Sequence, residues 1–124
     1  MKSLFSILFT ALLISCSAQE KADENVVMAD VSNEEAKELM AQQPDLQIID
    51  VRQNAEVANG IIDGAIQMDI SKPAFDAQIE TLDKEMPVLV YCAAGGRSKT
   101  AQEIMEEAGF KTVYNLKRGY ERWE

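Results

Sequence analysis

The chain has 124 residues, enough for one domain, and its hydrophobic share of 47% is typical of a globular protein. Its formal net charge of -9 makes it a poor partner for nucleic acid or for an anionic lipid surface. Because the sequence contains no histidine, Ser-His-Asp and Cys-His hydrolases and histidine metal sites are excluded, and we expect neither a metal nor a cofactor.

Residues 1–15 predict an export signal. Lys2 precedes a mostly apolar run that ends at Ile14, which is too short for a bilayer-spanning helix of roughly 20 residues. The run closes on Leu13-Ile14-Ser15-Cys16, which resembles the cleavage box of bacterial lipoproteins and implies lipid attachment to Cys16. The alternative is an ordinary signal peptide cut near Ala18.

The lipoprotein resemblance implies an exported protein that is lipid-anchored in the bacterial cell envelope. We expect it at the periplasmic face, and the choice between inner and outer membrane stays open. Residues 16–29 then form a polar tether, and the folded domain is predicted to span 30–124.

The elements of the domain follow from periodicity and turn residues. Helical spacing predicts helices over 33–42, 73–80 and 98–108, with one helical turn at 55–59. Short aliphatic runs predict strands at 47–51, 65–68, 88–91 and 112–115. Strands that alternate with helices are typical of an α/β domain with a mostly parallel central sheet flanked by helices.

One loop gathers the reactive residue types. Cys92 directly follows the most apolar strand, at the carboxyl end where α/β folds place their sites. The next residues form a predicted anion cradle: Ala93, Ala94, Gly95, Gly96, Arg97 and Ser98. Small side chains let backbone N–H groups curl toward the sulfur, and the following helix adds partial positive charge, so the nucleophilic thiolate is favoured. The alternative is a cysteine that serves only as a small core residue.

The segment Cys92-x-x-Gly95-x-Arg97-Ser98 resembles the active loop of the single-domain rhodanese family. The likeness covers about residues 30–124 through further motifs in order: Ile49-Asp50-Val51-Arg52, Glu56, Gly60, Gly64-Ala65-Ile66, Ala108-Gly109-Phe110, Val113-Tyr114-Asn115-Leu116, and Gly119-Tyr120 to Trp123. The chain departs from the family at Ile61, where histidine is usual, and at Arg118, where glycine is frequent. The resemblance implies a rhodanese-like fold.

The same resemblance implies a thiosulfate sulfurtransferase. Cys92 would take sulfur from thiosulfate or a similar small anionic donor, hold it as a persulfide, and pass it to a thiol or cyanide acceptor. Arg97 would bind the donor's oxygens, and the N–H groups of residues 93–98 would stabilise the persulfide. Asp50, Arg52 and Glu56 are expected to brace the loops rather than touch substrate. We expect a monomer that meets the membrane only through its lipid.

Three other functions are set against this one. Cysteine phosphatases, and by extension arsenate reductases, place one more residue between cysteine and arginine than the four of Ala93–Gly96, so they are disfavoured. A thiol-redox protein is disfavoured because the mature chain would have no second free cysteine. A non-enzymatic binding or sulfur-carrier module at the membrane stays open.

Overall fold

The structure is a computed structural model that describes residues 25–124. The predicted export signal and Cys16 lie outside the described residues, as does the tether up to residue 24. Among the described residues, no helix has the length and apolar character that crossing a membrane requires.

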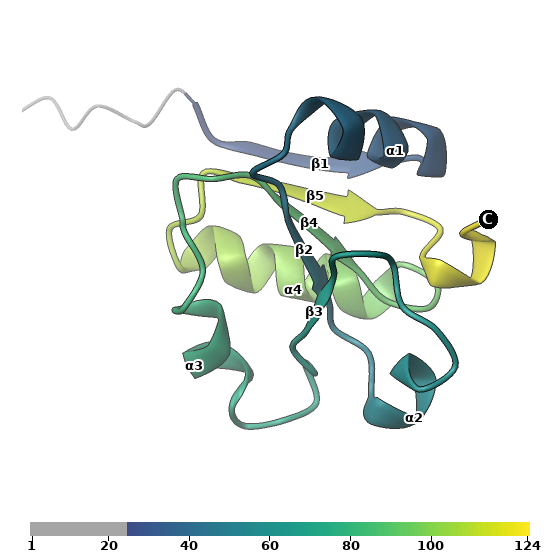
Figure 1. The fold of residues 1–124 in the computed structure, drawn as a ribbon. Coiled ribbons are helices and arrows are strands. Elements are labelled where there is room, and N and C mark those ends of the chain that lie inside the picture. The colour runs from purple at the N-terminus through teal and green to yellow at the C-terminus, as the bar shows by residue number, and fades with distance from the viewer. Residues whose placement is uncertain (1–24) are drawn as a thin grey trace, which may run out of the picture.

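A five-stranded sheet forms the centre of the fold, and every pair of neighbouring strands is parallel (Figure 1). The strand order is β1-β5-β4-β2-β3. The strands are β1 (Val27–Val31), β2 (Gln47–Asp50), β3 (Ile66–Gln67), β4 (Val88–Tyr91) and β5 (Thr112–Leu116). The expected α/β class with a parallel sheet is confirmed.

Helices cover both faces of this sheet. They are α1 (Asn33–Gln42), α2 (Asn54–Val57), α3 (Phe75–Ile79) and α4 (Gly96–Glu107), followed by a short 3-10 turn at Tyr120–Arg122. Helices α3 and α4 pack on one face, and α1 packs on the other together with the C-terminal segment. Figure 1 shows α4 lying along the sheet on the side opposite α1.

Strand β4 is the centre of the core. All four of its residues have an exposed fraction of 0%, because β5 and β2 flank it and helices cover it above and below. The sequence expectation rested on this continuous apolar run, which is typical of a buried parallel strand. The carboxyl end of β4 is therefore held rigidly on all sides, and this is where Cys92 begins the next loop.

Strand β1 is the element that the sequence analysis missed. It pairs with β5 from Val27, opposite Thr112, to Val31, opposite Leu116. Residues 27–29, assigned to the tether, therefore belong to the sheet. The strand lies at an edge and Val27 is 42% exposed, so it lacks the apolar run that revealed the central strands.

Two helix starts determine the geometry of the sheet's carboxyl edge. The predicted cap of the first helix is confirmed, because the Ser32 hydroxyl accepts a hydrogen bond from the Glu35 N–H at 3.1 Å. A cap of this kind contributes about 1 kcal/mol. The fourth helix begins at Gly96, two residues earlier than expected, since Gly95 adopts a left-handed conformation with φ of +97° that turns the chain into the helix.

Candidate active site

The sulfur of Cys92 sits inside the loop that joins β4 to α4. The residue is 1% exposed, and its Sγ accepts a hydrogen bond from the Gly95 N–H at 3.1 Å. The Ser98 hydroxyl lies 3.3 Å from the same sulfur. A buried sulfur ringed by donors at a helix start is suited to hold a negative charge.

These contacts set the acidity of the thiol. Burial raises the pKa of Cys92, but hydrogen bonds from the Ser98 side chain and from the N–H groups of Ser98, Ala94 and Gly95 lower it more in sum. The net pKa is below the ordinary value for cysteine. The contacts therefore increase the share of the nucleophilic thiolate relative to an ordinary cysteine, in the direction that the sequence suggested.

The two glycines of the loop have different roles. A Cβ atom on Gly95 would lie 2.1 Å from the carbonyl oxygen of Lys117, and its φ of +97° already disfavours any other residue. A Cβ atom on Gly96 would meet nothing within 4 Å. Of these two positions, only position 95 requires glycine because of close backbone packing.

The segment after β5 supports the loop from outside. The Tyr120 N–H donates to the Cys92 carbonyl at 2.8 Å, and the Glu121 N–H donates to the Ala93 carbonyl at 3.0 Å. A Cβ atom on Gly119 would lie 2.3 Å from the Ala93 carbonyl oxygen, so a larger residue would push the two segments apart. The sequence motif marked Gly119 and Tyr120 without revealing this contact.

The guanidinium of Arg97 forms a two-pronged ion pair with Glu56 of α2. Its two terminal nitrogens donate to the two carboxylate oxygens at 2.7 and 2.8 Å. The hydrogen bond from Arg97 is the largest cause that lowers the pKa of Glu56, to about 2. The pKa of Arg97 is raised first by Glu56 and also by the nearby Cys92. Arg97 thus lies close to the sulfur, with part of its donor fork already engaged.

A second arginine braces the other side of the loop. Arg52 forms a buried ion pair with Asp50 at 2.7 Å and donates to the Gly60 carbonyl at 2.7 Å. Its guanidinium also lies over the ring of Tyr120, 4.3 Å from the centroid, and over that of Tyr91 at 5.5 Å. These contacts join the end of β2 and the turn at Gly60 to the end of β4 and the C-terminal segment, which agrees with the bracing role expected for Asp50 and Arg52.

A polar network links the loop to the sheet edge. The buried Asn115 side chain donates to the Asp30 carboxylate at 3.1 Å and to the Gly95 carbonyl at 3.5 Å. Lys99 pairs with the same Asp30 at 3.7 Å and donates to Gln102 at 3.0 Å. Lys99 is therefore part of the polar scaffold around α4.

The structure brings the predicted site residues together in one loop and first helical turn. The Gly95 N–H and the Ser98 hydroxyl contact the sulfur, and the Ala94 N–H also lowers the pKa of Cys92 by a hydrogen bond. Ala93 instead uses its carbonyl to bind the C-terminal segment. Sequence reasoning did not find the Glu56 partner of Arg97, because the two residues are 41 positions apart.

Known proteins resemble this chain over most of the described residues. The model of the rhodanese-like domain family matches residues 32–124. The putative sulfurtransferase YtwF of Bacillus subtilis is 35% identical over 95 residues, which cover 77% of this chain and 89% of that protein. The thiosulfate sulfurtransferase GlpE of Coxiella burnetii is 37% identical over 94 residues, which cover 76% and 85%.

Solved structures share the architecture. A rhodanese-like domain protein of Staphylococcus aureus superposes with a TM-score of 0.70 at 26% identity, over 78% of this chain and 92% of that one. The human single domain sulfurtransferase TSTD1 superposes with a TM-score of 0.64 at 26% identity, over 76% and 93%.

Proposed function

The chain belongs to the rhodanese-like domain family and is a rhodanese-type sulfurtransferase, and on this premise we propose that it moves sulfane sulfur through a persulfide on Cys92. The proposed donor is thiosulfate or a similar small anion, and the proposed acceptor is a thiol or cyanide. The observation that carries the proposal is the position of the Cys92 sulfur, held at 3.1 Å from the Gly95 N–H and 3.3 Å from the Ser98 hydroxyl.

In the first step the Cys92 thiolate attacks the outer sulfur of thiosulfate. A new S–S bond forms between protein and donor, the S–S bond of the donor breaks, and sulfite leaves with its electron pair. The persulfide that remains carries the single negative charge that the thiolate carried before. Because the residue is only 1% exposed, a slender terminal sulfur is the kind of group that can reach it.

In the second step an acceptor thiolate or cyanide attacks the outer sulfur of the persulfide. The S–S bond to Cys92 breaks, the acceptor leaves as a persulfide or as thiocyanate, and the Cys92 thiolate returns. The N–H groups that lower the pKa of Cys92 stabilise negative charge in this cradle before and after each step.

Arg97 supports the first step by its charge and by the donors that Glu56 leaves free. A guanidinium has five N–H groups, and the ion pair with Glu56 uses two of them at 2.7 and 2.8 Å. The pairing holds the planar fork in one orientation near the sulfur, which reduces the entropy lost when sulfonate oxygens bind. Glu56 is thus a positioning residue for Arg97.

Two-substrate kinetics test this function. With thiosulfate and cyanide varied together, double-reciprocal plots should give parallel lines, because a covalent intermediate separates the two substrates. Cys92→Ser should remove turnover and leave the thermal unfolding midpoint close to that of the parent, since the two side chains differ little in size. Intersecting lines, or turnover by a folded Cys92→Ser variant, would contradict the persulfide.

The predicted export signal extends this proposal to the cell envelope. We propose cleavage before Cys16 and lipid attachment there, on the basis of the Leu13-Ile14-Ser15-Cys16 box. In cells fed radiolabelled palmitate, the full chain should become labelled and stay with membranes. Cys16→Ala should lose the label and leave the membrane fraction, whereas a labelled Cys16→Ala variant would contradict the anchor.

A further inference from the structure

A buried amide lies beneath the active loop. The side chain of Asn115, in β5, is 3% exposed and lies on the same face of the sheet as Val113, which packs against the core under α4. Its Nδ2 donates to the Gly95 carbonyl at 3.5 Å and to the carboxylate of Asp30 in β1 at 3.1 Å. The sequence analysis marked Asn115 only as a member of a motif, without a role.

Only one orientation of this amide fits its surroundings. The Asp30 carboxylate and the Gly95 carbonyl both accept hydrogen bonds, so the nitrogen of the amide must face them. The amide oxygen of Asn115 is buried and has no hydrogen-bond partner within residues 25–124. Because a buried oxygen without a partner is unfavourable, stability alone does not explain an asparagine at this position. Its contact with the loop is one that an apolar side chain could not make.

The end of β5 supports Gly95 at two points. The Gly95 carbonyl accepts from Asn115 and also, at 3.2 Å, from the Lys99 N–H in the first turn of α4. A Cβ atom on Gly95 would lie 2.1 Å from the Lys117 carbonyl oxygen, so the backbone of Gly95 rests directly on the end of the strand. The Gly95 N–H donates to the Cys92 sulfur at 3.1 Å. A shift of Gly95 would therefore move this N–H away from the sulfur.

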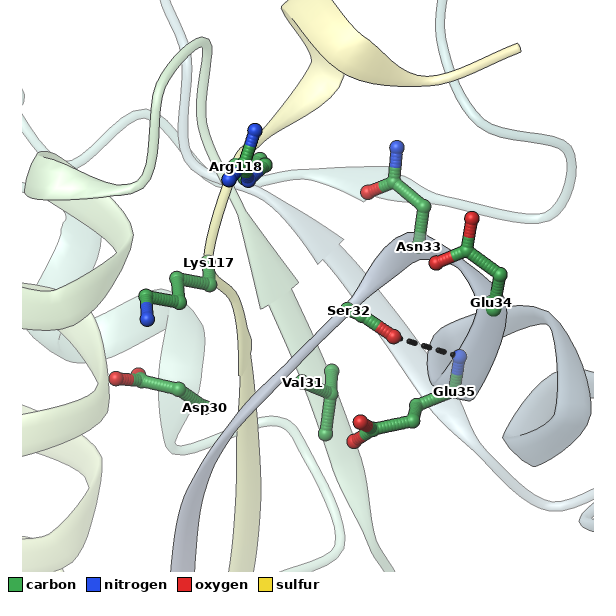
Figure 2. A pocket seen from close by; sticks show the side chains of 8 residues that line it. All are labelled: Asp30, Val31, Ser32, Asn33, Glu34, Glu35, Lys117 and Arg118. Atoms are coloured by element: carbon green, nitrogen blue, oxygen red, sulfur yellow. Dashed lines mark hydrogen bonds between the residues drawn. The ribbon is translucent and has the colours of Figure 1, made fainter.

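Asp30 orients the Asn115 amide from the neighbouring strand. The two residues are partners in the parallel register of β1 and β5, so their side chains lie next to each other. Asp30 also pairs with Lys99 of α4 at 3.7 Å. Figure 2 shows the Asp30 side chain on the side of the strands that faces away from the start of α1. With one N–H of the amide held by Asp30, the other is directed toward Gly95.

We propose that Asn115 is a positioning residue for sulfur transfer: its amide, oriented by Asp30, holds Gly95 where its N–H binds the Cys92 sulfur. Asn115 itself does not touch the sulfur or the substrate. This inference rests on the proposed function and adds a residue that lies 20 positions from Gly95 in the chain. An N–H that is already aligned stabilises negative charge on the sulfur without reorganising during the reaction. Removal of the amide should therefore slow the attack on thiosulfate in a protein that still folds.

Two amide-to-leucine substitutions test the inference in turnover. Asn115→Leu keeps the branching of the side chain and removes its hydrogen bonds without adding charge, so kcat/KM for thiosulfate should fall about tenfold. Gln47→Leu is the matched control, because the Gln47 amide bonds the backbone of Asp83 at 2.8 Å at the start of β2, the opposite edge of the sheet from the loop. It should lower the thermal unfolding midpoint and leave kcat/KM close to that of the parent.

An exchange of the two side chains separates positioning from stability. Asn115→Asp alone places a carboxylate against two acceptors and should lower both the unfolding midpoint and kcat/KM. When Asp30→Asn is added, the hydrogen bond between the two side chains returns in the reverse direction and the total charge is that of the parent, so the midpoint should recover. The carboxylate at position 115 still has no N–H for Gly95, so kcat/KM should stay low. Recovery of turnover together with stability would overturn the inference.

Alkylation of Cys92 by iodoacetamide, followed by peptide mass, separates this inference from the proposed function, because it involves no sulfur transfer. At neutral pH, Asn115→Leu should slow the alkylation of Cys92 about fivefold, and Gln47→Leu should leave it unchanged. Slower alkylation in Asn115→Leu alone would support the positioning role even if the parent took no sulfur from thiosulfate. Unchanged or faster alkylation in a folded Asn115→Leu protein, or an equal loss in Gln47→Leu, would overturn it even if the parent transfers sulfur.

Discussion

The active loop differs in the organisation of its polar groups from the groove between the start of α1 and the segment after β5, which Glu34, Glu35, Lys117 and Arg118 line among others (Figure 2). In the loop, the Cys92 sulfur has donors at 3.1 and 3.3 Å, and Arg97 is held by Glu56. In the groove, the side chains of Glu34 and Arg118 have no hydrogen-bond or ion-pair partner within residues 25–124. The loop is preorganised around one atom, whereas the groove leaves its charges available to a ligand.

The comparison suggests how one small domain can separate chemistry from recognition. A preorganised loop stabilises charge at a fixed place and gains nothing from adapting to different substrates. Unpaired surface charges bind more weakly but select among ligands by their charge pattern. Substitutions in the loop should therefore affect transfer to every acceptor alike.

The two arginines give the largest test of this contrast. Arg97→Ala should lower kcat/KM for thiosulfate by about 100-fold, and by the same factor whether cyanide or cysteamine is the acceptor, because the first step is common to both. In Arg118→Ala, kcat/KM for thiosulfate should stay close to that of the parent with either acceptor, because this side chain lies outside the active loop. Initial rates with each acceptor measure both effects, and an acceptor-dependent loss in Arg97→Ala would break the distinction.

The two glycines of the loop test how tightly it is packed. Gly95→Ala should reduce the free energy of unfolding by about 3 kcal/mol, because the new Cβ would meet the Lys117 carbonyl at a φ of +97°. Gly96→Ala is the control and should change it by less than about 1 kcal/mol, since that position is open. Urea unfolding measures both, and equal effects would contradict the packing.

Ser98 tests the electrostatic part of the loop. Ser98→Ala removes the hydroxyl beside the sulfur, so the pKa of Cys92 should rise, and alkylation by iodoacetamide below that pKa should slow about tenfold. Thr100→Ala removes an exposed hydroxyl two residues further along α4 and should leave the pH profile unchanged. A profile that moves equally in both variants would assign the low pKa to the helix as a whole.

Removal of the half-exposed ion pair between Glu56 and Arg97 should have the smallest effect on stability, and this effect depends on pH. The pKa of Glu56 falls from 4.5 to about 2 on folding, so its contribution is complete above pH 4.5 and is lost as the pH falls toward 2. Glu56→Gln should cost no more than about 1 kcal/mol at neutral pH, because water screens the pair. The difference from the parent should vanish near pH 2.

The control for this pH dependence is Glu103→Gln, which removes an exposed carboxylate of α4. When unfolding free energies are measured between pH 2 and 7, the difference between the parent and Glu56→Gln should shrink below pH 4.5, and Glu103→Gln should show no such change. A difference from the parent that stays constant across this range would mean that the ion pair adds nothing to stability.

Local patterns in the sequence were sufficient to predict the loop. The apolar run of β4, the small residues after Cys92 and the helix that follows are all short-range signals, and each element was found. The Ser98 hydroxyl and the Gly95 N–H lie within six positions of the sulfur that they contact. A motif can reveal such contacts because the chain that makes them is continuous.

Contacts between distant segments could not be predicted in this way. The pair of Glu56 and Arg97 spans 41 positions, and β1 pairs with β5 near the opposite end of the chain. Strand β1 is half exposed at a sheet edge, so its own residues give little signal. Contacts across the fold therefore depend on topology, whereas the reactive loop is visible in the local sequence.

The most direct test of the central claim is the intact mass of the purified protein before and after thiosulfate, without reductant. The persulfide mechanism predicts a gain of one sulfur atom, which cyanide removes and which Cys92→Ser does not acquire. A folded protein whose Cys92 is readily alkylated but never gains that mass would contradict sulfur transfer from thiosulfate through this residue.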